Sequence, residues 1–269
     1  MVSDCLKITF LGSGTSTGVP QIGCQCEVCR STDPRDKRLR QSAVVEYRGK
    51  RILIDCGPDF RQQYLACGCP HLDALLITHI HYDHVGGLEE LRGFPDLPIY
   101  ARADVIAALH SRLAYCFAEH PYPGVPHFNL VEIDDNTAFD CCGITIEPIP
   151  VLHYRLPILG FRIGPLAYIT DCKTIGDEQI LRLHGVPLLV INALRQEEHL
   201  SHLSLPQALE VINKINPGRA VLVHMSHHMG LHDQVAKTLP PGVELAYDGM
   251  VLEIDNTTEG VANFNNNLT

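Results

Sequence analysis

The chain of 269 residues contains no tryptophan, and aromatic side chains make up only 6% of it. Proteins that bind single-stranded nucleic acid without sequence preference stack the bases on aromatic side chains, and this composition offers few such platforms. An excess of positive charge is also missing, because 21 Lys and Arg stand against 31 Asp and Glu, a formal net charge of −10. That balance argues against a broad surface that follows a phosphate backbone, although bound divalent ions would make one cleft locally positive.

Long apolar runs are absent as well. No stretch reaches the ~18 consecutive apolar residues that a membrane-spanning helix needs, and residues 1–10 lack the basic and apolar regions of a secretory leader. We therefore expect a cytoplasmic protein with no membrane partner. In that compartment the eleven cysteines are expected to be thiols or metal ligands and not disulfides.

The apolar pattern predicts strands and helices in two successive halves. Strands are expected at 6–11, 42–47, 51–55, 72–78, 99–101, 131–133, 144–148, 160–163, 166–170, 188–193, 220–224 and 244–246. Helices are expected at 85–91, 104–118, 177–184 and 205–215. No low-complexity linker divides the chain, so residues 1–269 are predicted to form one α/β domain with two βα halves packed as a sandwich. The tail from about residue 256 is expected to be frayed.

Residues 78–84 read Thr-His-Ile-His-Tyr-Asp-His and follow an apolar strand directly. In an extended loop His79 and His81 point to the same side, whereas Asp83 and His84 lie on the following turn. Imidazole and carboxylate groups are ligands that suit Zn²⁺, Fe and Mn²⁺. A group of surface histidines is the alternative, but three His and one Asp within six residues at a strand end favour a metal site.

The pattern His-x-His-x-Asp-His resembles the signature of the metallo-β-lactamase superfamily, and the resemblance extends from about residue 6 to residue 249. Three later residues at strand ends match the remaining motifs in order, namely His153, Asp171 and His224. The resemblance implies an αββα sandwich with two divalent metals, Zn or Mn, in its active site. One metal would be held by His79, His81 and His153, the other by Asp83, His84 and His224, with Asp171 bridging both. Two such ions, ~3.5–4 Å apart, would activate a shared water for hydrolysis.

Cys24, Cys26 and Cys29 lie within six residues, in a knuckle at 23–29. This spacing predicts three corners of a tetrahedral structural zinc site, with a redox or iron–sulfur role and free buried thiols as alternatives. Together with the preceding Gly-Val-Pro-x-x-Gly, the segment is similar to the PhnP-type phosphodiesterases of the phosphonate C–P lyase pathway. The resemblance implies that His227 is the fourth zinc ligand, and the adjacent His228 competes for this role. The other cysteines are expected to be buried or incidental thiols.

The same resemblance singles out His202, in Ser-His-Leu-Ser-Leu, as a catalytic histidine that is not a metal ligand. It is expected to protonate the leaving oxygen or to contact the phosphoryl oxygens. The nearby His199 is an alternative for this role, and a helix cap or a surface histidine is the structural alternative. Asp83 is counted with His202 among the catalytic residues as well as among the metal ligands.

These features favour a dinuclear hydrolase acting on small cyclic or diester phosphates. A ribonuclease Z-like endonuclease, a glyoxalase II-like thioesterase and a non-catalytic metal-binding relative are the alternatives. The acidic balance argues against a stable nucleic-acid complex, and a homodimer is suggested only by the resemblance.

Two further segments are less informative. Residues 102–126 match no member of the family, and Arg112, Tyr115 and His120 are candidates for substrate contacts there. The glycine-rich turn at 12–18 fails the spacing of both a P-loop and a dinucleotide fingerprint.

Overall fold

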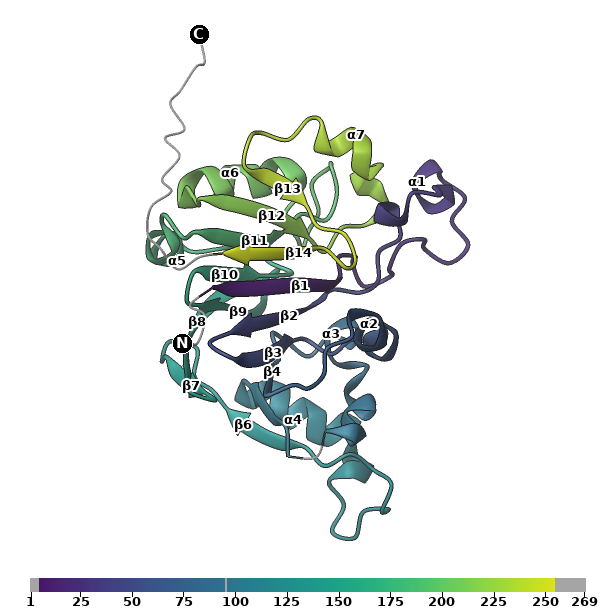
Figure 1. Cartoon of the computed structure of the whole chain (residues 1–269), viewed down its shortest axis with the longest axis vertical. Helices are drawn as coiled ribbons and strands as arrows, with labels where there is room; N and C mark the ends of the chain where they lie inside the picture. Colours follow the sequence, from purple (N-terminus) through teal and green to yellow (C-terminus); the bar gives the residue numbers. More distant parts are fainter. Residues whose placement is uncertain (1–4, 95, 255–269) are drawn as a thin grey trace.

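The computed structural model describes residues 5–94 and 96–254. Two mixed sheets of seven strands each pack against one another, and helices lie over their outer faces (Figure 1). The first sheet has the order β14 (Val251–Ile254), β1 (Leu6–Gly12), β2 (Ser42–Tyr47), β3 (Lys50–Ile54), β4 (Ala74–Leu76), β5 (Pro98–Ala101) and β6 (Asn129–Glu132). The second has the order β13 (Val243–Leu245), β12 (Arg219–Val223), β11 (Leu188–Asn192), β10 (Leu166–Ile169), β9 (Leu156–Ile163), β8 (Ile144–His153) and β7 (Phe139–Cys141).

The helices connect these strands. They are α1 (Glu27–Arg30), α2 (Phe60–Cys67), α3 (Tyr82–Val85), α4 (Ala103–Arg112), α5 (Asp177–Leu183), α6 (Leu205–Ile215) and α7 (His232–Ala236). Four short 3-10 turns are η1 (Pro34–Asp36), η2 (Leu88–Gly93), η3 (Ala114–Cys116) and η4 (His227–Met229). The arrangement is the metallo-β-lactamase αββα sandwich that the sequence predicted.

Alternating side chains build the layers, because successive residues of a strand point to opposite faces. In β3, Ile52 and Ile54 belong to the core between the sheets, whereas Leu53 belongs to the cluster under the helices of the first sheet. In β10, Tyr168 belongs to the inner core and Ile169 to the outer cluster of the second sheet. The ends of strands from both sheets are therefore fixed by one shared apolar core.

Strand β8 runs five residues further than predicted, from Ile144 to His153. The predicted strand ended at Pro148, and proline cannot donate to a sheet ladder. Here β7 pairs only with residues 144–146, so Pro148 and Pro150 lie where β8 has no neighbour on that side. The extension places His153 at the end of the strand.

Two predicted helices are wrong in extent. The expected helix 85–91 is divided into α3 and η2, because Gly86 and Gly87 interrupt it, and a Cβ on Gly87 would lie 2.0 Å from the Gly57 carbonyl oxygen. The expected helix 104–118 ends at Arg112 and is followed by η3. The sequence reading also missed α2 and β14. The tail predicted to be frayed lies outside the described residues.

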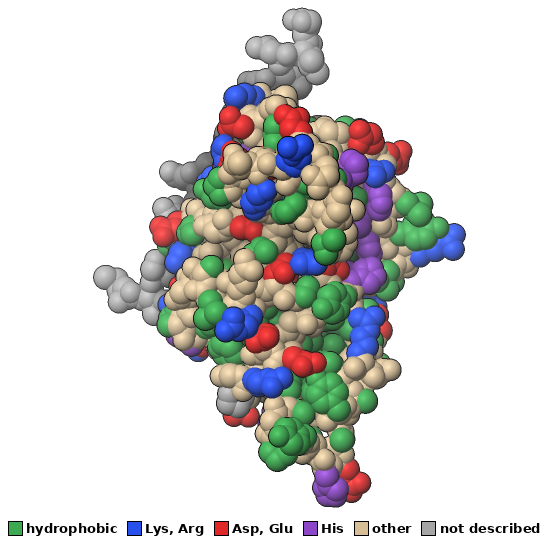
Figure 2. All heavy atoms as spheres, turned by 90° about the vertical axis from the view of Figure 1, so that its right-hand side faces the viewer, with side chains coloured by type: hydrophobic (Ala, Val, Ile, Leu, Met, Phe, Trp, Pro, Cys, Tyr) green, Lys and Arg blue, Asp and Glu red, His purple; other side chains and the backbone are tan. Residues whose placement is uncertain are grey.

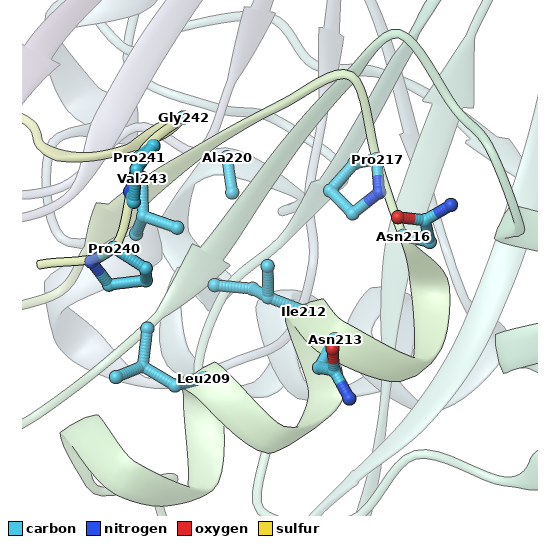
Figure 3. Close-up of a pocket in the computed structure, with 10 residues that line it drawn as sticks. All are labelled: Leu209, Ile212, Asn213, Asn216, Pro217, Ala220, Pro240, Pro241, Gly242 and Val243. Carbon is cyan, nitrogen blue, oxygen red and sulfur yellow. The ribbon is translucent and has the colours of Figure 1, made fainter. Parts of the chain in front are cut away.

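A shallow apolar pocket of about 110 Å³ lies between α6 and the turn before β13, and its lining includes Leu209, Ile212 and Val243 (Figure 3). None of its lining residues is a predicted ligand or catalytic residue. Among the described residues, no helix is long and apolar enough to cross a membrane.

Asp248, on the turn between β13 and β14, ties three segments together. One carboxylate oxygen accepts hydrogen bonds from the Ser13 amide (2.9 Å) and the Ser13 hydroxyl (2.8 Å), and the other accepts from the Leu39 amide (2.7 Å). Burial raises the pKa of Asp248 to about 6, against the effect of these donors. The buried surroundings of Asp248 thus disfavour the charged form of its carboxyl group.

We expect this group to make the protein less stable as the pH rises. Between the ordinary aspartate pKa of ~4 and about 6, the folded protein keeps a proton that the unfolded chain has lost, so its stability falls through this window. From pH 5 to pH 7 the free energy of unfolding should drop by roughly 1 kcal/mol more in the wild type than in Asp248→Asn, which does not titrate. Urea unfolding at both pH values measures this difference, and equal drops would contradict it.

Candidate dinuclear metal centre

The predicted ligands lie in turns at the ends of strands. Residues 79–84 follow β4 in the first sheet, whereas His153 ends β8, Asp171 follows β10 and His224 follows β12 in the second. Figure 2 shows histidine side chains gathered in a column on the face of the molecule that carries these turns. The candidate site therefore lies where the two sheets meet.

A first ligand group combines His79, His81, His153 and Asp171, whose ligand atoms lie within 4.8 Å of one another. The Nε2 atom of His79 is 3.0 Å from Nδ1 of His81 and 3.8 Å from Oδ2 of Asp171. His153 turns its Nδ1 away and toward the carbonyl oxygen of Ser201, at 2.8 Å, which leaves its Nε2 for the site.

A second group combines Asp83, His84, Asp171 and His224 within the same limit. His84 Nε2 lies 3.1 Å from Oδ2 of Asp83 and 3.4 Å from Oδ1 of Asp171. His224 Nε2 lies 3.4 Å and 3.1 Å from the same two oxygens. Asp171 thus turns Oδ1 toward the second group and Oδ2 toward the first, which is the placement that a bridging carboxylate requires.

The backbone at these turns is strained in a consistent way. Asp55, Asp171 and His224 have φ angles of 59°, 54° and 57°. These angles lie in the left-handed region, which residues other than glycine seldom adopt. Such strain persists only where surrounding contacts impose it, and it gathers at functional sites. At Asp171 the buried amide of Asn192 supplies that contact, since it accepts from the Cys172 N–H (2.7 Å) and donates to the Cys172 carbonyl (3.0 Å).

Asp55 is a residue of the site that the sequence reading missed. It is fully buried, accepts a hydrogen bond from His84 Nδ1 at 2.7 Å, and accepts two more from the amide and hydroxyl of Thr78. A carboxylate behind a ligating imidazole fixes the ring and its tautomer. The one signal in the sequence is an acidic residue directly after an apolar strand, which by itself is weak.

Four observations fit this pair of groups to divalent metals. His84 Nε2 is buried and has no hydrogen-bond partner among the described residues. Burial holds the pKa of His79 well below its usual value, so the imidazole is neutral and can act as a ligand. Although burial opposes ionisation of Asp171, the neighbouring His224 and His84 hold its pKa well below the usual range. Burial lowers the pKa of His84, but the carboxylates of Asp171, Asp55 and Asp83 outweigh it and raise that pKa well above the usual value. This excess of negative charge is what divalent ions would neutralise in place of protons, and neutral imidazoles and ionised carboxylates are the donors that Zn²⁺ and Mn²⁺ accept.

His202 lies at the edge of both groups. Its Nε2 is 3.4 Å from Oδ2 of Asp171, and its ring stacks on His224 with centroids 5.0 Å apart. It belongs to neither ligand group, and its predicted role as a catalytic residue that does not bind metal stays a prediction. Asp83, by contrast, lies inside the second group of possible ligands, and its predicted catalytic role stays a prediction.

The cysteine knuckle forms a separate group of possible ligands. Cys24, Cys26, Cys29 and His227 lie within 4.8 Å of one another by their ligand atoms. The Nδ1 atom of His227 is 3.3 Å from the sulfur of Cys24 and 3.2 Å from that of Cys26. His228 is not in the group, so of the two candidates the structure brings His227 to the thiols. Three sulfurs and one imidazole match a structural zinc site.

Of the three candidate substrate contacts, Arg112 contacts the loop that carries the first two histidines. Its guanidinium donates to the carbonyl oxygen of Ile80, between His79 and His81. Tyr115 and His120 are exposed beyond the end of α4 and enter neither ligand group. The glycine-rich turn also comes close, since Gly14 bridges Met225, the residue after His224.

Comparisons with known proteins identify the family of the chain. Residues 50–225 match the family model of the beta-lactamase superfamily domain. The chain belongs to this superfamily. A solved structure described as a new diphosphatase from the PhnP family is 36% identical, with a TM-score of 0.86, and the match covers 93% of this chain and 97% of that one.

Two curated relatives also match over 93% of this chain. The octanoyltransferase of Porphyromonas gingivalis is 47% identical over 255 residues, but the match covers only 52% of that protein, so the chain spans about half its length. The coenzyme PQQ synthesis protein B of Methylorubrum populi is 34% identical over 311 residues, and the match covers all of that protein.

Removing the carboxylate behind His84 should weaken the second group most, because Asp55 contacts His84 directly and reaches His79 of the first group only through the Thr78 hydroxyl. For Asp55→Asn we expect metal affinity at this group to fall ~10–100-fold, the usual effect of losing such a partner. Titration against a chromophoric chelator measures it. Asp73→Asn, at the opposite end of β4, is the matched control because Asp73 contacts Lys50 and Arg51 and no ligand. Unchanged affinities in Asp55→Asn would show that Asp55 does not support the site.

The cysteine knuckle should hold one ion independently. For Cys29→Ser we expect elemental analysis to give one zinc fewer per chain than the wild type, with the remaining ions unchanged, because Cys29 belongs to neither histidine group. Cys56→Ser, a buried cysteine outside all three groups, should keep the full content. An unchanged zinc content in Cys29→Ser would exclude the knuckle as a metal site.

Proposed function

We propose that this chain is a metal-dependent hydrolase that cleaves small phosphate diesters, cyclic ones included, with two divalent ions in its centre. The observation that carries the proposal is the position of Asp171, whose two oxygens face two different sets of ligands. A site with one ion would need only one of these sets. The similarity to a diphosphatase of the PhnP family supports phosphorus as the atom attacked.

The chain's own residues would hold and orient the reactants. His79, His81 and His153 would hold one ion, Asp83, His84 and His224 the other, and Asp171 both. When bound, such a pair supplies activation of a water and neutralises charge that develops on the phosphoryl oxygens. Arg112, anchored on the Ile80 carbonyl, would offer further N–H donors to a phosphate at the rim.

His202 completes the proposed machinery. It is half-buried at the edge of the centre with Nε2 toward the Asp171 carboxylate, so a substrate held between the metals would meet this nitrogen. When the bond from phosphorus to the leaving oxygen breaks, the proton on Nε2 would pass to that oxygen. The remaining parts of the proposal, a cytoplasmic protein that forms a homodimer and no stable nucleic-acid complex, rest on composition and family resemblance.

Hydrolysis of an acyl thioester is the second candidate, because the most similar of the curated relatives cited above is named an octanoyltransferase. That name belongs to a protein about twice as long as the matched region. The two candidates differ in the substrate atom that the water attacks, phosphorus or a carbonyl carbon, while the metal ligands stay the same.

One set of assays separates the candidates. The purified chain is analysed for metals and assayed with bis(p-nitrophenyl) phosphate, a cyclic ribose phosphate, octanoyl and lactoyl thioesters, and a precursor transfer RNA. Three transition-metal ions per chain with turnover of the phosphate diesters support the proposal. Turnover of a thioester alone would replace the substrate class, turnover of the RNA alone would favour a ribonuclease Z-like enzyme, and metal content without any turnover would favour a non-catalytic relative.

We expect His202→Ala to retain all metals and to lose activity according to the leaving group. For a diester with an alkoxide leaving group, kcat should fall ~10²–10⁴-fold, the usual contribution of a general acid. For bis(p-nitrophenyl) phosphate the loss should be much smaller, because p-nitrophenolate leaves without a proton. His184→Ala, a histidine at the end of α5 outside the ligand groups, is the control. Equal losses on both substrates would exclude the general-acid role.

A further inference from the structure

The side chain of His199 lies behind His202, on the side away from the metal ligands. The Nδ1 atoms of the two rings are 3.2 Å apart, and Ser201 Oγ lies 3.0 Å from the Nδ1 of His202. On its other side, His202 directs Nε2 toward Asp171. The stacked ring of His224 and the edge-on ring of His153, with centroids 5.0 Å and 4.6 Å away, fix the plane of His202.

The hydrogen-bond pattern determines which nitrogen carries the hydrogen. The backbone N–H of Ser201 points at His199 Nδ1, at 3.3 Å. A backbone amide can only donate, so this Nδ1 presents its lone pair. Two lone pairs at 3.2 Å would repel, so a hydrogen on His202 Nδ1 is the arrangement that fits. The Ser201 hydroxyl, 3.0 Å from His202 Nδ1 and 3.3 Å from His199 Nδ1, fits the same assignment, since it can accept from the first and donate to the second. These distances are long for hydrogen bonds, as expected when the Ser201 amide, the Ser201 hydroxyl and His202 Nδ1 all approach one lone pair.

We propose that His199 is a positioning residue that keeps a hydrogen on His202 Nδ1, so that Nε2 alone exchanges a proton with the substrate. In a histidine the partner of one ring nitrogen decides the state of the other. After Nε2 has given its proton to the leaving oxygen, His202 is a neutral ring that still carries its hydrogen on Nδ1. The next proton then enters at Nε2. This inference rests on the proposed role of His202.

Ser201 explains why the arrangement is stable. Its amide fixes His199 as the acceptor, and its carbonyl oxygen accepts from Nδ1 of His153. The same residue thus orients a metal ligand of the first group and the acceptor behind His202. Leu200, by contrast, is 68% exposed and lies in the same segment without entering a ligand group.

The test compares His199→Leu, which removes the acceptor, with His199→Asn, whose amide oxygen can take the place of Nδ1. In His199→Leu we expect kcat for an alkoxide-leaving diester to fall ~10–100-fold, as for other partners of functional histidines, with KM and metal content unchanged. His199→Asn should restore most of this loss, and Leu200→Ala should match the wild type. In the His202→Ala background, His199→Leu should cause no further loss.

A spectroscopic readout tests the inference without turnover. In ¹⁵N-histidine-labelled, metal-loaded protein, the His202 signals (assigned with His202→Gln) should report a protonated Nδ1 in the wild type and in His199→Asn. In His199→Leu the hydrogen should move to Nε2 in part or in full. Unchanged nitrogen shifts in His199→Leu would overturn the inference. If the shifts move as expected but no phosphate diester is cleaved, the proposed function fails while the role of His199 stands.

Discussion

The carboxylate of Asp171 lies between two sets of imidazoles, and much of the buried polar structure serves to keep it there. Its oxygens face His79 on one side and His84 and His224 on the other. Burying an anion is costly unless charges or hydrogen bonds compensate it. The Thr170 hydroxyl bonds to it directly, at 2.7 Å, and Asn192 fixes the backbone that follows. A carboxylate so confined keeps the two ligand groups at one separation.

This arrangement depends on the packing of the two sheets, because each sheet supplies part of the ligands. Gln41, which follows the knuckle segment and precedes β2, connects them at the site. Its buried amide donates to the Tyr168 hydroxyl at 2.7 Å and accepts from the His224 amide at 3.3 Å. Tyr168 in turn belongs to the core between the sheets. A shift of one sheet against the other would therefore move His224 away from Asp83, and the second group would open.

A part of the site can be predicted from the sequence when its residues are close together in the chain, and not when only the fold brings them together. Residues 79–84 are adjacent in the chain, so their spacing alone indicates a metal site. The later candidate ligands were predicted because they match the motifs of the family in order. Asp55, Asn192 and Gln41 are single polar residues beside apolar strands, and only the folded chain shows what they contact. His153 was predicted from the family motif although its strand was predicted to end early, since the sequence does not show that Pro148 and Pro150 occupy an unpaired edge.

The two candidate metal sites share one segment of chain, since His224 and His227 are three residues apart. The buried guanidinium of Arg38 fixes this segment, because it donates to the carbonyl oxygens of Ser226 (3.0 Å) and Gly230 (3.1 Å). The same guanidinium pairs with Asp36 at 3.4 Å. The β-bridge between Gly14 and Met225 also fixes this segment. These contacts involve no cysteine. Because Arg38 and Gly14, and not the thiols, fix the backbone around His224, the histidine centre can keep its geometry when the knuckle holds no metal. The knuckle, in contrast, depends on this segment, because the segment must already be in place to bring His227 to the thiols.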